Sequence, residues 1–155
     1  MRGNDKVVEV LNALLADELT AVSQYMVHSE MCANWGYRRL HEMSEKRAIV
    51  EMKHAEELIG RILFLEGQPV VSHLNPINIG QDVPAQLEND RKSEEGAIKN
   101  YNDAIKLTAE LGDNGSKKQL EGNLEAEESH IDELEAQLDE IKQMGLQTYL
   151  LGQLS

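Results

Sequence analysis

A short signature, glutamate followed three residues later by histidine, occurs twice in the chain and constrains its fold more than any other feature. The two copies are Glu51-x-x-His54 and Glu127-x-x-His130. On a helix, residues three apart lie on the same face, so each pair can present a carboxylate and an imidazole to one metal ion. The sequence therefore predicts two helices that each carry part of a metal site.

Each copy of the signature is preceded by a further glutamate at the same distance. Glu18 precedes Glu51 by the same separation along the chain as Glu94 precedes Glu127. The whole set therefore occurs twice with one constant offset, the one that relates Glu18 to Glu94. In both halves the midpoint between the two glutamates falls at or beside a glycine-containing turn, so a helical hairpin would place them at the same height. We therefore expect two hairpins that bring four carboxylates together.

Composition and periodicity indicate an all-α protein. Only three prolines, one phenylalanine and one tryptophan occur among 155 residues, and apolar residues recur at three- and four-residue steps along four segments. Asn4 or Asp5 can cap the first helix, and Asp82 can cap the third, with Pro84 in its first turn. The expected helices cover residues 5–34, 37–66, 82–111, 116–144 and, as a short fifth helix, 146–153.

Residues 67–82 join the second and third expected helices and show no helical period. These sixteen residues can extend over about 53 Å, enough to run alongside a helix of about 45 Å. A connection of this length leaves the two helices that it joins parallel. The sequence thus predicts a single domain, a four-helix bundle with a long crossover between its second and third helices.

The chemistry of the six side chains favours a dinuclear metal centre. A lone carboxylate buried among apolar residues is costly, whereas four carboxylates and two imidazoles are tolerated around two divalent ions. Oxygen-rich sites with one imidazole per ion suit iron or manganese, with zinc as a competitor. One glutamate from each of two helices and Glu-x-x-His from the other two is the known pattern of ferritin-like di-iron proteins. The expected metal-binding and catalytic residues are Glu51 and Glu127 as bridges, Glu18 and His54 on one ion, and Glu94 and His130 on the other.

The chain resembles the bacterioferritin family over its whole length, through LLADELTAVSQY, NWGYRRL, EMKHAEELIGRILFLEG, NIGQDV, EEGAI, EESHIDELE and KQMGLQTYL. This resemblance implies a ferritin-like fold and a homo-oligomeric, hollow shell of 24 subunits built from dimers. It implies ferroxidase activity, the oxidation of Fe(II) by O2 or H2O2 at the di-iron centre, with ferric mineral stored inside. A small ferredoxin-type protein is the expected reductant for the release of iron.

The resemblance also implies a haem, of b-type or a related porphyrin, held between two-fold related subunits by one methionine from each. The matching residue is Met52. It follows Glu51 and so lies about 100° further round the helix, on a different face. Ile49, Ile59 and Leu63 continue an apolar line there, and a helix with two apolar faces usually buries both. The second face therefore predicts contact with another subunit.

Some other residues have weaker signals. Lys46 and Val50 stand where some bacterioferritins have a His and an Asp facing the cavity, which argues against an additional inner-surface iron site. Tyr25 lies on the stripe of Glu18, and we expect its hydroxyl to bond a ligand carboxylate, with a redox role as the alternative. Three histidines lack partners at ligand spacing and are expected to be surface or structural residues: His28, His41 and His73.

Charge and the single cysteine narrow the possible partners and locations. A formal net charge of −13 argues against binding to nucleic acid or anionic membrane, and it favours cations. Cys32 stands alone, so no internal disulfide or Cys-x-x-Cys site is expected. The N-terminal segment lacks the apolar core of a signal peptide, and no run of 18 apolar residues occurs. We therefore expect a cytoplasmic protein.

Two alternatives to an iron-storage ferroxidase remain open from the residues alone. A di-iron or di-manganese peroxidase could use the same ligands, although the chain has no Cys-x-x-Cys pair for the rubredoxin-type donor of rubrerythrins. The other alternative is a haem-binding electron-transfer dimer built on Met52.

Overall fold

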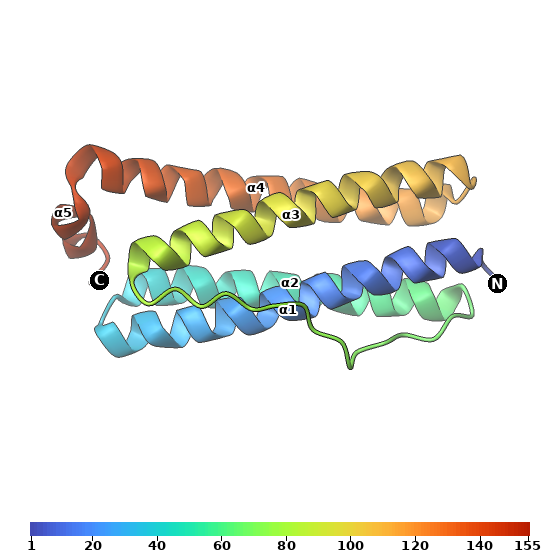
Figure 1. Cartoon of the computed structure of the whole chain (residues 1–155), viewed down its shortest axis with the longest axis horizontal. Helices are drawn as coiled ribbons and strands as arrows, with labels where there is room; N and C mark the ends of the chain where they lie inside the picture. The colour runs from blue at the N-terminus through green and yellow to red at the C-terminus, as the bar shows by residue number, and fades with distance from the viewer.

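Two long helical hairpins lie side by side in the structure, a computed structural model that describes residues 1–155 (Figure 1). α1 (Asp5–Trp35) and α2 (Arg38–Phe64) form one hairpin, and α3 (Val83–Glu110) and α4 (Asn114–Met144) form the other. α5 (Leu146–Leu151) turns away from the end of α4. The predicted fold, a ferritin-like four-helix bundle with a crossover and a short fifth helix, is confirmed. Helix ends differ from the expected ones by at most two residues.

Side-chain caps explain where three of the helices begin. Asn4 accepts a hydrogen bond from the backbone of Lys6, and Asp82 accepts one from Ala85, as the sequence indicates. α4 begins two residues earlier than expected because Asp113 caps it, through a bond from the backbone N–H of Ser116. Each cap satisfies a backbone donor that the first helical turn leaves free.

The end of α2 departs from the sequence-based expectation. The helix stops at Phe64 rather than at residue 66, and Glu66 adopts a left-handed conformation with φ of 60°. The N–H of Gly67 then bonds the carbonyl of Ile62 at 2.9 Å. This closure satisfies carbonyls of the last turn, as in other left-handed helix ends. The chain is thereby turned from α2 into the crossover.

The crossover returns along the outside of α1 from the end of α2 to the start of α3 (Figure 1). Three of its backbone N–H groups donate to side chains of α1 that lie four residues apart. Asn75 donates to Thr20 Oγ1 at 2.8 Å, and Asn78 donates to Gln24 Oε1 at 3.2 Å. Gly80 donates to His28 Nε2 at 3.0 Å. Because residues four apart share one helix face, these three side chains form a ladder for the crossover.

A buried carboxylate of α3 completes this ladder. Asp90 Oδ1 lies 2.8 Å from Gln24 Nε2 and 2.9 Å from His28 Nδ1. Since His28 Nε2 accepts from Gly80, Nδ1 carries the ring proton and donates to Asp90. His28 is therefore a fully buried structural residue, and His73 is exposed. The network joins α1, α3 and the crossover.

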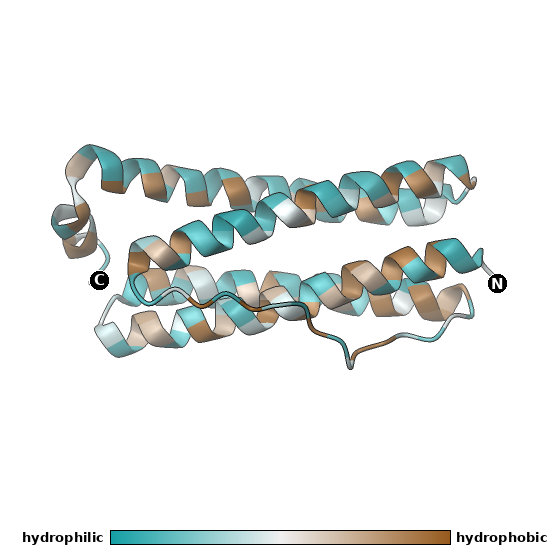
Figure 2. Ribbon diagram, in the orientation of Figure 1, coloured by the Kyte–Doolittle hydropathy of each residue, from teal (hydrophilic) through white to brown (hydrophobic).

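The apolar core is divided into two clusters along the bundle. One cluster includes Leu11, Leu58 and Leu120, and the other includes Leu40, Leu134 and Tyr149. Tyr149 is 1% exposed, so α5 is anchored to the second cluster through this side chain. Figure 2 shows hydrophobic residues along the crossover. Between the two clusters, buried polar side chains of the four long helices, among them Glu18, Glu51, Glu94 and Glu127, form a polar belt.

The second apolar face of α2 is present but shorter than expected. Ile49, Met52 and Leu63 are 43%, 44% and 58% exposed in this single chain. Ile59 instead packs against the first core cluster. Three of the four residues thus remain available for contact with another subunit. No helix combines the length and the apolar character needed to cross a membrane.

Candidate metal centre

The polar belt contains all six side chains that the sequence singles out as ligands. Every long helix contributes, with one glutamate each from α1 and α3 and one Glu-x-x-His pair each from α2 and α4. The potential ligand atoms form two groups within which all atoms lie within 4.8 Å of one another. The groups are Glu18, Glu51, His54 and Glu127, and Glu51, Glu94, Glu127 and His130. Two side chains, Glu51 and Glu127, are common to both.

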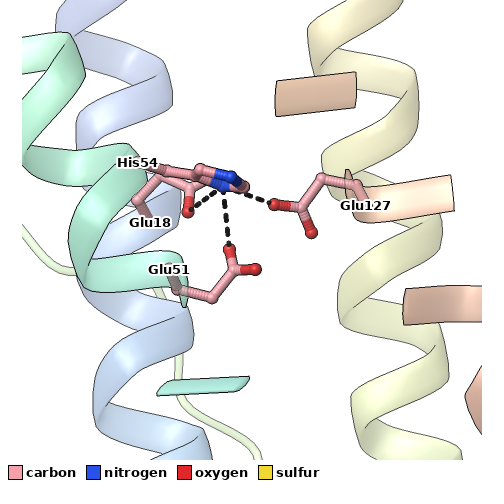
Figure 3. A group of neighbouring side chains, drawn as sticks. All are labelled: Glu18, Glu51, His54 and Glu127. Carbon is pink, nitrogen blue, oxygen red and sulfur yellow. Dashed lines mark hydrogen bonds and ion pairs between the residues drawn. The ribbon is translucent and has the colours of Figure 1, made fainter. Parts of the chain in front are cut away.

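His54 lies at the middle of the first group (Figure 3). Its Nδ1 atom is 3.0 Å from Glu127 Oε1 and 3.5 Å from Glu18 Oε2. It is 3.9 Å from Glu51 Oε2. Figure 3 shows Glu127 reaching from the second hairpin toward the three side chains of the first. The group therefore closes across the two hairpins.

His130 lies in the second group with nearly the same geometry. Its Nδ1 atom is 3.1 Å from Glu51 Oε1, 3.6 Å from Glu94 Oε1 and 3.5 Å from Glu127 Oε2. Glu51 and Glu127 thus each direct one oxygen to His54 and the other to His130. A carboxylate shared in this way has the arrangement needed to bridge two metal ions. The remaining glutamate in each group has the arrangement of a terminal ligand.

Two tyrosines support the carboxylates that are not shared. Tyr25 of α1 donates its hydroxyl hydrogen to Glu94 Oε1, as a core tyrosine was expected to do. Tyr101 of α3 donates to Glu18 Oε1 at 2.8 Å. The sequence analysis does not predict this role of Tyr101. The missed signal is the internal repeat, because Tyr101 follows Tyr25 by the same offset that relates Glu94 to Glu18.

Burial and mutual proximity shift the pKa values of the ligands in different directions. Burial, with the Glu18 carboxylate beside it, raises the pKa of Glu51 well above its ordinary value. Burial and the neighbouring Glu127 raise the pKa of Glu94 to about 8. Burial alone would raise the pKa of Glu127 too, but its close neighbours Glu94, His130 and His54 outweigh burial and lower it. Carboxyl groups with raised pKa values, Glu51 and Glu94, therefore lie beside Glu127, whose pKa is lowered.

Neighbouring carboxylates raise the pKa values of both histidines of the centre. Burial alone would lower the pKa of His54, yet its hydrogen bond to Glu127 and the nearby Glu18 carboxylate raise it to about 10. Burial also acts to lower the pKa of His130, but the adjacent carboxylates of Glu127 and Glu94 outweigh burial and raise it. The metal-free centre thus carries protons at positions from which a metal ion must displace them.

Unpaired polar atoms test whether the residues fit two metal ions. Nearly all buried polar atoms in proteins have a hydrogen-bond partner. Five buried atoms of the expected ligands have no hydrogen-bond partner: Glu18 Oε2, Glu51 Oε1, Glu94 Oε2, Glu127 Oε2 and His130 Nδ1. Four of them are carboxylate oxygens, which accept bonds from cations. The donor set and its unpaired oxygens therefore fit two divalent ions.

A cavity of about 650 Å³ connects this centre with the surface between α1, α3 and the crossover. All four glutamates of the centre contribute to its lining. Toward the surface, Asp17 accepts hydrogen bonds from Asn75 Nδ2 at 2.7 Å and Asn100 Nδ2 at 2.8 Å. We name it the access cavity. Its polar lining suits the passage of a hydrated cation or a small oxidant.

The structure brings one of the three remaining histidines, His41, close to two glutamates. His41 forms a further group with Glu30 and Glu45 near the α1–α2 turn, and both glutamates are exposed. His41 Nε2 lies 3.7 Å from Glu45, which is four residues further along α2. Exposed groups of this kind are common without a metal, and this one is separate from the buried centre.

Comparisons with known proteins show the family to which the chain belongs. Residues 8–144 match the ferritin family, described as a ferritin-like domain. The chain is 42% identical over 151 residues to a bacterioferritin of Rhodobacter capsulatus, covering 97% of this chain and 94% of the relative. It is 43% identical over 155 residues to a bacterioferritin of Brucella melitensis, covering 100% and 95%. A bacterioferritin of Mycolicibacterium paratuberculosis is 38% identical over 149 residues, covering 96% and 94%.

Proposed function

Since this chain belongs to the ferritin family and, within it, to the bacterioferritins, we propose that it is a ferroxidase that stores the iron it oxidises. The reaction is oxidation of Fe(II) to Fe(III) by O2 or H2O2 within one subunit. One observation carries the proposal: Glu51 and Glu127 each direct one carboxylate oxygen toward His54 and the other toward His130. Two ions bound in this way are neighbours, as a two-electron oxidant requires.

Fe(II) is the substrate, and each residue has a distinct part in holding it. Glu51 and Glu127 hold two ions together, and the other carboxylates, Glu18 and Glu94, complete one ion each. The histidines supply one neutral nitrogen per ion once their protons leave. When both ferrous ions are bound, the pair supplies two electrons to the oxidant. The tyrosine hydroxyls orient Glu18 and Glu94 through the oxygen that each bonds.

Electrostatics supports the movement of iron toward the centre. The chain carries a formal net charge of −13, which raises the local concentration of cations around it. The access cavity then leads Fe(II) past Asp17 to the four buried carboxylates. Storage requires a closed space, so the proposal includes a homo-oligomeric shell of 24 subunits with the ferric mineral inside. That number comes from the family resemblance.

A haem between two subunits is part of the proposal, and Met52 is the residue that would bind its iron. The thioether lies on a residue that is 44% exposed, and the neighbouring Ile49 is 43% exposed. An apolar, accessible surface around a methionine fits a porphyrin that is covered by a second copy of the same face. Bound there, haem would supply one-electron transfer, with a small ferredoxin-type protein as the reductant.

Replacement of Glu94 tests the proposed reaction. Glu94→Ala removes the terminal carboxylate of one ion, and we expect fast Fe(II) oxidation to slow by about a hundredfold or more. The matched control is Glu95→Ala, because Glu95 is adjacent, exposed and paired only with Arg91 on the surface. The measurement is anaerobic Fe(II) titration followed by O2, with particle size and haem absorbance recorded on the same sample.

The outcomes separate the candidate functions. Equal rates in the wild type and Glu94→Ala would contradict a ferroxidase centre at these residues. Rapid turnover of H2O2 without retention of iron would favour a di-iron or di-manganese peroxidase. Haem absorbance with no dependence of iron oxidation on Glu94 would favour a haem-binding electron-transfer dimer.

A further inference from the structure

Two smaller cavities approach the metal centre between α2 and α4, one beside each histidine. The His54 cavity has a volume of about 540 Å³ and is lined by His54, Lys118, Gly122 and Asn123, among others. The His130 cavity has a volume of about 440 Å³ and is lined by residues that include His130, Arg39, Lys46 and Arg47. Both lie apart from the access cavity between α1 and α3.

Because of the internal repeat, residues that line one cavity correspond in sequence to residues that line the other. With the offset that relates the two sets of metal-centre residues, Arg39 corresponds to Gly115, Lys46 to Gly122 and Arg47 to Asn123. Each of these residues lines its own cavity. The two cavities therefore occupy equivalent places in the two halves of the bundle but differ in charge.

Apart from their histidines, the His130 cavity has more cationic than anionic side chains, whereas the two kinds are equal in the His54 cavity. The His130 cavity has three cationic side chains, which face two carboxylates, Glu42 and Glu133. The His54 cavity has Lys118 and Glu57 alone as charged side chains besides its histidine. In a chain with only 15 lysines and arginines against 28 acidic residues, three cations in one cavity are unusual. They favour an anion, not a metal ion, as the occupant of the His130 cavity.

Arg47 has a free hydrogen-bonding group in addition to its charge. Its side chain is only 3% exposed, and its Nη2 pairs with Glu133. The guanidinium lies 5.7 Å from the centroid of the Tyr25 ring. Its Nη1 is buried without any hydrogen-bond partner. An arginine side chain is not deprotonated in proteins, so Nη1 remains a hydrogen-bond donor without an acceptor.

We propose that the His130 cavity binds a small tetrahedral oxyanion of the phosphate class, held by Arg47 together with Lys46 and Arg39. Guanidinium groups hold such anions through paired, charge-assisted hydrogen bonds. Lys46 and Arg39 are exposed, so their long side chains can turn toward a bound anion. Glu133 is 52% exposed and can turn into solvent, and Glu42 already pairs with Arg38 at 3.0 Å.

The role that we give to this anion site rests on the proposed function. The existence of the site does not. His130 belongs both to this cavity and to the second ligand group. An oxyanion bound in the His130 cavity would lie beside the metal ion of the second ligand group. Oxyanions are ligands for Fe(III), a hard cation. The bound oxyanion would therefore accept ferric iron only at the His130 side of the centre.

Binding of inorganic phosphate to the metal-free, full-length protein tests the site directly. Equilibrium dialysis with radiolabelled phosphate measures affinity without any iron chemistry, and sulfate and chloride serve as competitors. We expect the double variant Lys46→Gln, Arg39→Gln to weaken phosphate binding by about tenfold or more. Both residues are exposed, so we expect the double variant to retain the folded structure. The matched control is Lys118→Gln, which removes a cation from the His54 cavity and should leave affinity unchanged.

The results separate this inference from the proposed function. The anion site would be overturned if the wild type bound no phosphate. It would also be overturned if Lys118→Gln lost as much phosphate affinity as the double variant. Glu94→Ala should bind phosphate like the wild type even though its iron oxidation is lost. Phosphate binding by a protein that fails to oxidise Fe(II) would sustain the anion site and remove only its role in iron storage.

Discussion

At the scale of single residues, each unshared carboxylate is held from the opposite hairpin. Tyr25 of the first hairpin bonds Glu94 of the second, and Tyr101 of the second bonds Glu18 of the first. Burial raises the pKa of both phenols well above the ordinary value, so both remain hydrogen-bond donors at neutral pH. The two bonds thus connect the hairpins as well as orienting the ligands.

Removal of one of these hydroxyls should cost both stability and rate. Tyr101→Phe leaves Glu18 Oε1 without its donor, and the free energy of unfolding should fall by about 1.5–3 kcal/mol, as for other bonds to charged groups. Denaturant titration of the metal-free protein measures this change. Stopped-flow oxidation of Fe(II) should show a slower reaction in both Tyr101→Phe and Tyr25→Phe. A far greater loss of rate in Tyr25→Phe, at equal iron affinity, would indicate a redox role for Tyr25.

Metal binding should release protons at neutral pH. The pKa of His54 is about 10 and that of Glu94 is about 8, so both groups are protonated at pH 7 in the metal-free centre. A metal ligand must give up its proton, so two divalent ions should displace at least the two protons of these groups. Affinity should therefore fall as the pH is lowered, because protons compete for the ligands.

Zinc can measure this release without oxidation. Titration of the weakly buffered, metal-free protein with Zn(II) and a pH indicator counts the protons that appear. Glu94→Ala should release fewer protons than the wild type, whereas Glu95→Ala should match it. Release of no protons at pH 7 would mean that the ligands are already deprotonated.

At the scale of secondary-structure elements, the crossover is held by side chains of α1 and not by its own backbone pairing. Thr20, Gln24 and His28 accept its N–H groups at successive turns. The crossover also forms one wall of the access cavity, through Asn75 and its neighbours. The position of this segment therefore affects both the stability of the bundle and access to the centre.

Gly80 of the crossover packs tightly against the backbone at the start of α3. A Cβ atom added there would lie 2.2 Å from the backbone nitrogen of Gln86, so Gly80→Ala must displace the backbone. We expect it to lower the free energy of unfolding by about 2–4 kcal/mol. Hydrogen exchange at Asn78 and Gly80 should accelerate. Denaturant titration and exchange measurements check both expectations.

A helical glycine supplies the control for this substitution. Gly96 lies in α3, and an added Cβ atom there would meet nothing within 4 Å. Gly96→Ala should raise the free energy of unfolding by up to about 1 kcal/mol, because alanine has the higher helix propensity. Equal effects of the two substitutions would contradict the tight docking of the crossover.

At the scale of the whole molecule, a strongly acidic chain carries an uncovered apolar face on α2. Ile49 and Leu63 on this face are exposed in the single chain, and apolar faces of this kind mark contacts between subunits. Like charge opposes assembly at long range, so apolar contact has to outweigh it. The proposed haem would lie at the same contact.

A charge on this face should reduce the size of the assembly. We expect Ile49→Asp to yield particles smaller than the wild type, measured by light scattering, and to bind less haem, because the haem site needs two subunits. Lys106→Asp, an exposed change on α3, serves as the control and should retain wild-type size. A wild type that remains at 17.4 kDa would remove the shell, although oxidation at the centre could persist.

The helices, the hairpins and the meeting of the six metal-centre side chains follow from regularities along the chain. Helical periodicity is a local property, and it places Glu51 and His54 on one face before any tertiary contact forms. Equal spacing of Glu18 and Glu51 about a turn is a second such property, because antiparallel helices bring equidistant residues to the same height. The internal repeat then relates the two halves of the centre.

Contacts between segments distant in sequence are what only the folded structure decides. The return of the crossover along the α1 ladder, the end of α2 at Phe64 and the crossed bond from Tyr101 to Glu18 depend on such contacts. So does the charge of the His130 cavity, because Arg47 is buried and left with a free donor only when α2 and α4 pack together. Periodicity specifies which face a side chain occupies, and only packing specifies which atoms it meets.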